Sequence, residues 1–192
     1  MPQNLKVVIV GDGGCGKTSL LMVYTKKRLS RGKTIDKATI ISEIKINKYR
    51  TSWQTKNDYD RLRPVSYPNA NLVLICYDVI CPSSYDNVLI KWYPEVHHFC
   101  HGVPIILVGC KTDLRKDKGL GKETVGEETK KKIKAELYLE CSAKYKENVE
   151  DIFREATKQA LAANKEIQKG KEERILCPSV TQEIMLSTTV SS

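Results

Sequence analysis

Residues 11–18 read GDGGCGKT, and their glycines, lysine and threonine suit the binding of phosphate. Glycines let successive backbone N–H groups curve around an anion, and a helix starting after the loop adds the positive end of its dipole. Lys17 is placed to reach the β- and γ-phosphates of a nucleotide, and the Thr18 hydroxyl to bind Mg²⁺. A strand-like VVIV precedes the loop and an apolar helix start follows it. We therefore interpret the segment as a phosphate-binding loop in preference to a flexible glycine-rich turn.

Two later stretches, CKTD at 110–113 and CSAK at 141–144, each end an apolar run of strand length. Ligands of open α/β sheets bind beyond the carboxyl ends of the strands, so both stretches are predicted to meet one ligand. The Asp113 carboxylate suits the N1–H and 2-amino donors of guanine, which adenine lacks on that edge. The Lys111 stem suits the purine face, and the Ala143 N–H suits guanine O6. Each stretch alone is a weak signal, since a Lys-x-Asp after a strand is usually a solvated turn.

The elements that must position these motifs follow from the apolar pattern. Runs of strand length occupy 5–10, 72–79, 104–110 and 137–141, and helical patterns occupy 17–27, 84–99, 123–135 and 148–169. Near-continuous Val, Ile and Leu is typical of parallel strands covered on both faces. The alternation predicts an α/β fold with a mostly parallel sheet and helices on both faces, and the phosphate-binding loop at 11–18 makes it a fold of the P-loop NTPase type. We assign 4–169 to one domain and 170–192 to a basic-to-polar, disordered tail, and we expect an antiparallel edge hairpin within 38–55.

The motifs also carry a family resemblance. GDGGCGKTSLL, CKTD and CSAK, in this order, resemble the nucleotide-binding motifs of the Ras-like small GTPases. DYDRLRPVSYPNANLVLICYDV, SSYDNVLIKWYPEVHHFC and GCKTDLRKDK are similar to the Rho family, with the Rif-like subgroup nearest. The similarity is dense over 4–24, 58–118 and 137–160.

The resemblance implies a small GTPase domain that binds GDP and GTP with Mg²⁺ and hydrolyses GTP as a switch in actin-cytoskeleton signalling. It also implies exchange factors, GTPase-activating proteins and actin-regulating effectors as partners. Thr18 would bind the metal, and Lys17 would stabilise the transferred phosphate. By resemblance the nucleotide site comprises Gly11, Asp12, Gly13, Gly14, Cys15, Gly16, Lys17, Thr18, Ser19, Cys110, Lys111, Asp113, Ser142, Ala143 and Lys144.

The resemblance is interrupted between Tyr24 and Asp58. The family carries there a Tyr-x-Pro-Thr-Val-like switch loop and an Asp-Thr-Ala-Gly-Gln-Glu segment, whereas this chain has TKKRLSRGKTIDKATIISEIKINKYRTSWQTKN. Gln54 stands in place of the magnesium-side Asp, and neither a Gly nor a catalytic Gln lies between Trp53 and Asp58. The missing groups hold Mg²⁺ through water, sense the γ-phosphate and orient the attacking water. We therefore expect hydrolysis, if it occurs, to be slow.

Charge is concentrated in the same interval. The chain carries a formal net charge of +9, and residues 25–50 contribute nine Lys or Arg against two acids. No aromatic residue interleaves with these charges before Tyr49, so no nucleic-acid partner is predicted. A shifted reading frame or alternative exon explains the interval most simply. Thr34 and Thr39 are the candidates to replace the switch threonine, although their surroundings do not match the family.

Three further features bear on compartment and partners. Seven cysteines without CxxC spacing favour a reduced, cytoplasmic chain, and no apolar run approaches membrane-spanning length. Basic residues lead into Cys177, but fifteen residues follow it, so we expect no prenylation and only weak contact with anionic membrane. HHFCH at 97–101 is expected to be an exposed helix end in preference to a metal site. The segment 119–136 is expected to hold one short helix, which leaves insert-dependent partners in question.

Other functions remain open on the sequence. The main alternative is a non-switching guanine-nucleotide-binding protein that holds GDP or sequesters an exchange factor. A nucleotide kinase or ATPase on the same loop is disfavoured by CKTD and CSAK. An unstable variant product without activity is the third alternative.

Overall fold

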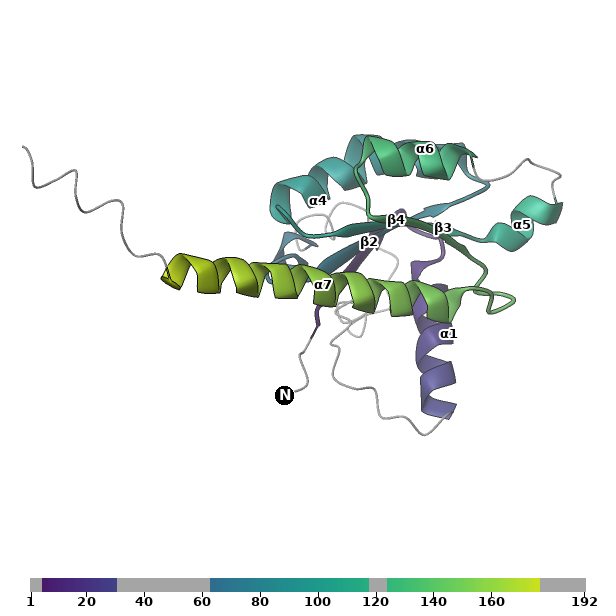
Figure 1. The fold of residues 1–192 in the computed structure, drawn as a ribbon. Coiled ribbons are helices and arrows are strands. Elements are labelled where there is room, and N and C mark those ends of the chain that lie inside the picture. The colour runs from purple at the N-terminus through teal and green to yellow at the C-terminus, as the bar shows by residue number, and fades with distance from the viewer. Residues whose placement is uncertain (1–4, 31–62, 118–123, 177–192) are drawn as a thin grey trace, which may run out of the picture.

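A computed structural model describes residues 5–30, 63–117 and 124–176. Within these ranges the chain forms a sheet with helices on both faces: α1 and α7 lie on one side, and α4 and α6 on the other (Figure 1). The predicted α/β architecture is therefore confirmed. The expected hairpin within 38–55 falls outside the described residues.

The described sheet has four parallel strands in the order β1-β2-β3-β4, which is also their order along the chain. Every residue of the first three strands is buried, whereas β4 is half-buried up to its last residue. Because helices cover both faces, neither side of the central strands meets water, and this explains their continuous apolar runs. The strands are β1 (Val7–Gly11), β2 (Leu72–Asp78), β3 (Ile105–Cys110) and β4 (Leu137–Cys141), close to the predicted ranges.

The helices differ from prediction at two places. The pattern expected over 84–99 is three consecutive segments that begin at Pro82, and the last helix continues to Leu176 instead of ending at 169. The helix therefore continues into the segment assigned to the tail, and 177–192 falls outside the described residues. The segments are α1 (Lys17–Ser30), η2 (Arg63–Ser66), α3 (Pro82–Asn87), η3 (Val88–Trp92, a π-helix), α4 (Tyr93–Phe99), α5 (Thr112–Asp117), α6 (Thr124–Lys132) and α7 (Val149–Leu176).

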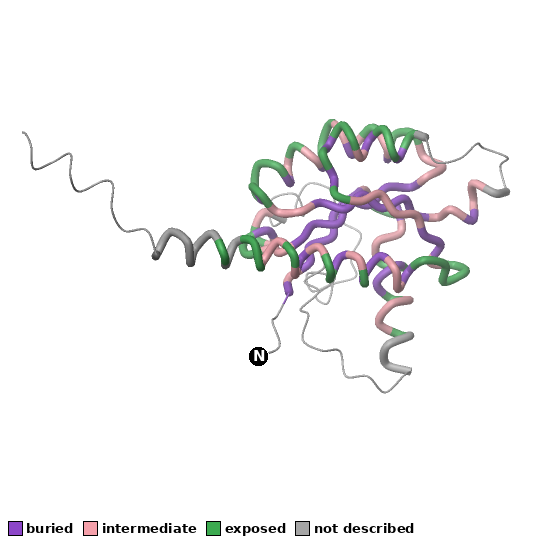
Figure 2. Tube along the Cα trace, viewed as in Figure 1, coloured by how far each residue is buried: buried purple, intermediate pink, exposed green. Residues whose placement is uncertain are grey.

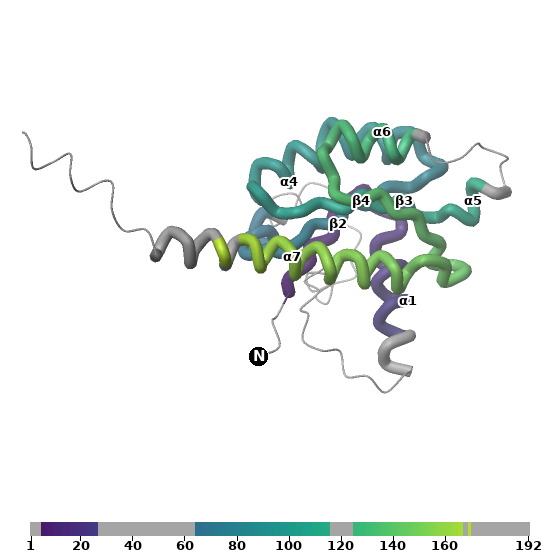
Figure 3. The backbone as a smooth tube through the Cα atoms, in the orientation of Figure 1, coloured from purple at the N-terminus to yellow at the C-terminus, as the bar shows by residue number. Residues whose placement is uncertain are grey.

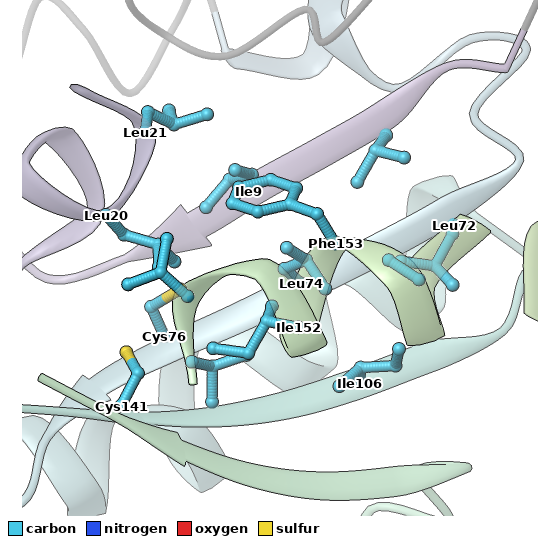
Figure 4. Close-up of a cluster of buried hydrophobic side chains, with 14 of the residues drawn as sticks. Ile9, Leu20, Leu21, Leu72, Leu74, Cys76, Ile106, Cys141, Ile152 and Phe153 are labelled. Carbon is cyan, nitrogen blue, oxygen red and sulfur yellow. The ribbon is translucent and has the colours of Figure 1, made fainter. Parts of the chain in front are cut away.

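Two apolar clusters, one on each face, hold the helices against the sheet, and β1, β2 and β3 are buried along their whole length (Figure 2). On the α1–α7 face, Leu20, Ile152 and Phe153 pack among strand side chains such as Ile9 (Figure 4). The Tyr24 ring stacks on Phe153 with centroids 3.9 Å apart, which ties α1 to α7. This packing fixes the start of α1, and with it the loop that precedes it.

The remaining expectations concern surface and membrane. His97, His98 and His101 are exposed at the end of α4, and the described residues contain no cluster suited to a metal ion. The expected exposed helix end is confirmed. None of the described helices is long and apolar enough to cross a membrane. Thr124–Lys132 is the short helix expected after the LRKDK stretch.

Candidate nucleotide-binding site

The loop at 11–16 joins the carboxyl end of β1 to the start of α1, as its sequence predicts. Gly11 has φ +142°, and a Cβ there would lie 2.1 Å from the carbonyl oxygen of Cys76 on β2. Gly16 has φ +120°, and its Cβ would lie 3.1 Å from that of Cys110. Both positions therefore need glycine, for the turn and for the close approach to neighbouring strands. The loop is fixed against the sheet at both of its ends.

Lys17 folds back onto the loop. Its ammonium donates hydrogen bonds to the carbonyl oxygens of Gly11 at 2.8 Å and Asp12 at 2.7 Å. The positive charge thus stays beside backbone that also carries the N–H groups of the turn. An anion seated there would meet both the ammonium and the amino end of α1.

A pocket of about 550 Å³ opens beside the loop at the carboxyl ends of β3 and β4. Seven of the predicted site residues line it: Gly16, Ser19, Cys110, Lys111, Asp113, Ala143 and Lys144. The structure thus brings the three motifs together around one cavity. Figure 3 shows how: α5 leaves the end of β3, and the segment before α7 leaves the end of β4.

Four lining residues were not predicted: Leu20, Val23, Leu114 and Cys141. They supply apolar wall to the cavity. Leu114 directly follows Asp113, and Leu20 and Val23 lie within the first two turns of α1, so proximity to the motifs was the available signal.

A buried hydrogen bond orients the predicted base-reading carboxylate. Ser142 has 0% exposure and donates from Oγ to Asp113 Oδ1 at 2.7 Å, while Asp113 is 7% exposed. The same hydroxyl oxygen accepts the Tyr145 N–H at 3.2 Å. Cys110 and Cys141 lie opposite each other in the β3–β4 register, so the two motifs begin side by side. Ser142 is therefore a support beneath Asp113 and lies outside the pocket lining.

Lys111 occupies a strained position at the pocket wall. Its φ of +65° is left-handed, which is unfavourable for a residue with a side chain. Its ammonium donates to Asp78 Oδ2 at 2.8 Å, and Asp78 also accepts the Ile80 N–H at 3.1 Å. The hydrogen bond to Asp78 raises the pKa of Lys111. The lysine head is thereby anchored while its stem lines the cavity.

The Asp12 side chain is hydrogen-bonded to residues of α3 and η3. Its carboxylate accepts hydrogen bonds from Asn87 Nδ2 and Trp92 Nε1, each at 2.8 Å. Only its carbonyl oxygen contacts Lys17. No local sequence pattern predicted these partners on α3 and η3.

Four buried cysteines lie near the loop and the pocket: Cys15, Cys76, Cys110 and Cys141. Burial raises the pKa of Cys15 to about 11, and hydrogen bonding from Cys141 and then Cys76 lowers the pKa of Cys110. The six described cysteines are all free. Cys15, Cys76 and Cys141 therefore act as small apolar side chains in the core.

Mg²⁺ was predicted to bind Thr18. This residue is exposed in the first turn of α1, directly after Lys17. A single hydroxyl suits Mg²⁺, which usually combines one or two protein ligands with phosphate oxygens and water. The described residues fit a metal that arrives with a nucleotide, and they offer no cluster that would hold one alone.

Comparison with known proteins decides the family. The model of the Ras family matches residues 6–162. The chain belongs to the Ras family. It is 54% identical to the Rho-related GTP-binding protein RhoF of Bos taurus, over 90% of this chain and 88% of that protein. It is 46% identical to human Rho-related GTP-binding protein RhoD, over 84% and 85%, and 42% identical to GTP-binding protein RHO1 of Candida albicans, over 87% and 93%.

These identities place the chain among the Rho-related small GTPases. RhoF represents the Rif subgroup, so the resemblance expected from the sequence is confirmed. The match from 6 to 162 covers the loop, CKTD and CSAK in a single domain. The α/β fold with a P-loop is the fold of that family.

Proposed function

We propose that this Rho-related chain binds GDP and GTP together with Mg²⁺ in the pocket between α1 and the ends of β3 and β4. The observation that carries the proposal is the buried Asp113–Ser142 pair at the wall of the cavity. A carboxylate with one oxygen already satisfied is oriented toward a ligand that supplies N–H donors. Guanine presents two such donors on one edge, and adenine presents neither there.

Each predicted residue has a role in this proposal. Backbone N–H groups of 13–18 and the Lys17 ammonium bind the β- and γ-phosphates, and Thr18 holds the metal. When bound, Mg²⁺ would neutralise charge on the phosphate oxygens. Ser19 and Gly16 line the pocket next to the loop, and Lys111, Ala143 and Lys144 enclose the base.

As a switch, the chain would exchange GDP for GTP, hydrolyse GTP and signal to actin-regulating effectors. Exchange factors and GTPase-activating proteins would be its regulators. Support comes from the Rho-related relatives, which are named GTP-binding proteins. We place this activity in the cytoplasm, with weak contact to anionic membrane, in keeping with the free cysteines and the excess of basic residues.

A second candidate is a guanine-nucleotide-binding protein that does not switch. The observation in its favour is Gln54, with no Gly or Gln between it and Asp58. These positions fall outside the described residues. Such a protein would hold GDP or sequester an exchange factor without turnover.

Binding of labelled GDP and of a non-hydrolysable GTP analogue, with and without Mg²⁺ and against an ATP analogue, tests both candidates. The switch requires guanine-specific binding that strengthens with Mg²⁺, followed by measurable release of phosphate from GTP. Guanine-specific binding without a gain from Mg²⁺ or the γ-phosphate would favour the second candidate. Equal affinity for the ATP analogue would refute the role of Asp113 and with it the proposed function.

A further inference from the structure

The π-helix η3 lies against the phosphate loop and interrupts the helical stretch from Pro82 to Phe99. The Tyr93 N–H bonds to the Val88 carbonyl five residues earlier, which is the π pattern. Such wide turns are rare and often occur at functional positions. This one has a specific geometric result at the loop.

Asn87 is the last residue of α3 and Trp92 is the last residue of η3, so the two are five residues apart. In an α-helix with 3.6 residues per turn, two such side chains would point about 140° apart. Here both donate to one carboxylate: Asn87 Nδ2 to Asp12 Oδ2 and Trp92 Nε1 to Asp12 Oδ1, each at 2.8 Å. The wide turn therefore brings two donors onto the same side of the helix.

The carboxylate that they hold belongs to the loop itself. Asp12 follows the last residue of β1, and its carbonyl oxygen accepts the Lys17 ammonium at 2.7 Å. Asp12 is thus held through its side chain by Asn87 of α3 and Trp92 of η3, and through its carbonyl oxygen by the Lys17 ammonium. Trp92 is only 4% exposed, so the indole that supplies one donor is itself fixed by the core.

The negative charge of Asp12 explains why its side chain must be held in place. A carboxylate in a loop that binds an anion opposes binding if it turns toward that anion. Two N–H donors stabilise the carboxylate in a direction set by η3 and satisfy both of its oxygens. Without these two hydrogen bonds, the Asp12 side chain and the adjoining backbone would be more mobile. Phosphate binding would then have to order them, which would weaken it.

We propose that Asn87 and Trp92 are positioning residues which hold the phosphate-binding loop in its binding geometry through Asp12. The inference rests on the proposed function, because it concerns how that site retains a nucleoside diphosphate. Neither residue touches the nucleotide; each acts through Asp12. The loop binds the phosphates of the nucleotide, so the preference for one base over another does not depend on the hydrogen bonds to Asp12.

The test is the rate at which the full chain releases tritium-labelled GDP into excess unlabelled GDP. A tritium label is preferred because changes at Trp92 would alter energy transfer to a fluorescent nucleotide. Trp92→Phe removes the N–H and keeps an aromatic ring; Asn87→Ala removes the other donor. Ile90→Ala is the matched control, since Ile90 lies in the same π-turn and is 74% exposed.

We expect Trp92→Phe and Asn87→Ala each to quicken release about three- to tenfold, part of the effect of a hydrogen bond to a charged group. Ile90→Ala is expected to match the wild type. The decisive comparison repeats both changes with Asp12→Ala, where they are expected to have no further effect. Preference for GDP over ADP is expected to stay unchanged throughout.

The outcomes separate this inference from the function on which it rests. The positioning role would be overturned if Trp92→Phe and Asn87→Ala both release GDP at the wild-type rate. It would also be overturned if the two changes accelerate release equally in the presence of Asp12→Ala. In either case nucleotide binding itself would remain intact. A wild-type chain that retains no GDP would overturn the proposed function and this inference with it. If Trp92→Phe does not fold, Asn87→Ala alone completes the cycle, because Asn87 is only half-buried.

Discussion

Replacing Ser142 with alanine removes the hydroxyl that orients Asp113 at the pocket wall. The hydroxyl donates to the carboxylate at 2.7 Å and accepts the Tyr145 N–H at 3.2 Å. Ser142 is fully buried and Asp113 nearly so. An alanine methyl offers neither hydrogen bond, so a buried carboxylate oxygen and a backbone N–H each lose a partner.

The size of the effect follows from the two bonds. A hydrogen bond to a charged group contributes about 1.5–3 kcal/mol and a neutral one about 0.5–1.5 kcal/mol, so Ser142→Ala should lower the free energy of unfolding by about 2–4.5 kcal/mol. The charged bond also orients the carboxylate that guanine meets. If the full contribution of this hydrogen bond, about 1.5–3 kcal/mol, is lost from the free energy of binding, the affinity for GDP falls roughly 10- to 150-fold.

Calorimetric titration with GDP and with inosine diphosphate measures the second effect. Inosine lacks the 2-amino group, so the preference for GDP reports how well Asp113 is oriented, and it should narrow in the variant. Ser83→Ala is the control, because Ser83 is exposed, its hydroxyl lies 3.2 Å from the Cys81 thiol, and it does not line the pocket. Affinity within about twofold of the wild type, with the same preference for GDP, would refute the reasoning.

Three further predictions follow from other contacts. Gly126→Ala should lower the free energy of unfolding by about 1–3 kcal/mol in denaturant titrations, because the alanine Cβ would lie 2.0 Å from Tyr138 Cζ. This cost is expected to exceed the gain from the higher helix propensity of alanine. Unchanged stability would mean that the ring moves aside at no cost. Asp78→Asn should return the pKa of Lys111 toward its ordinary value, as followed by NMR of the lysine side chain, and weaken GDP binding, since the 2.8 Å bond to Asp78 raises that pKa; an unmoved pKa would contradict this. The pKa of the Cys15 thiol is 9.0 in the unfolded chain and about 11 in the folded protein. Between pH 9 and pH 11 the thiol therefore loses its proton in the unfolded chain first, so the free energy of unfolding should fall as pH rises. Cys15→Ala should lessen that slope by up to about 1.4 kcal/mol per pH unit in unfolding experiments at pH 8 to 11, and an equal slope in both proteins would contradict it.

The sheet was the most predictable part of the fold. Its strands are covered on both faces, so nearly every residue must be apolar and the runs stand out in the sequence. The end of α7 was missed because residues beyond 169 lack the apolar period that marks a packed helix, although the backbone continues to Leu176. The π-turn was missed for another reason: its residues, VLIKW, also fit an ordinary helix.

The site was predictable where chemistry dictates residue type and less so where packing sets direction. The loop glycines, Lys17 and Asp113 can be recognised from the sequence because few other residues can take their roles. The direction of the Asp12 carboxylate depends on donors 75 and 80 residues away in the chain, which no local pattern reveals. The left-handed backbone of Lys111 was equally hidden, since nothing in CKTD distinguishes it from a relaxed turn.

The register between β3 and β4 has a consequence for how such proteins diverge. It sets Cys110 opposite Cys141, and the Ser142–Asp113 hydrogen bond joins the segments that follow these two strands, so the Asp113 carboxylate is held by residues of 105–148. None of the residues that make these contacts lies between 25 and 57. In the proposed function, selection of the base and response to the γ-phosphate therefore depend on separate stretches of the sequence, so a change in the second does not by itself change the first.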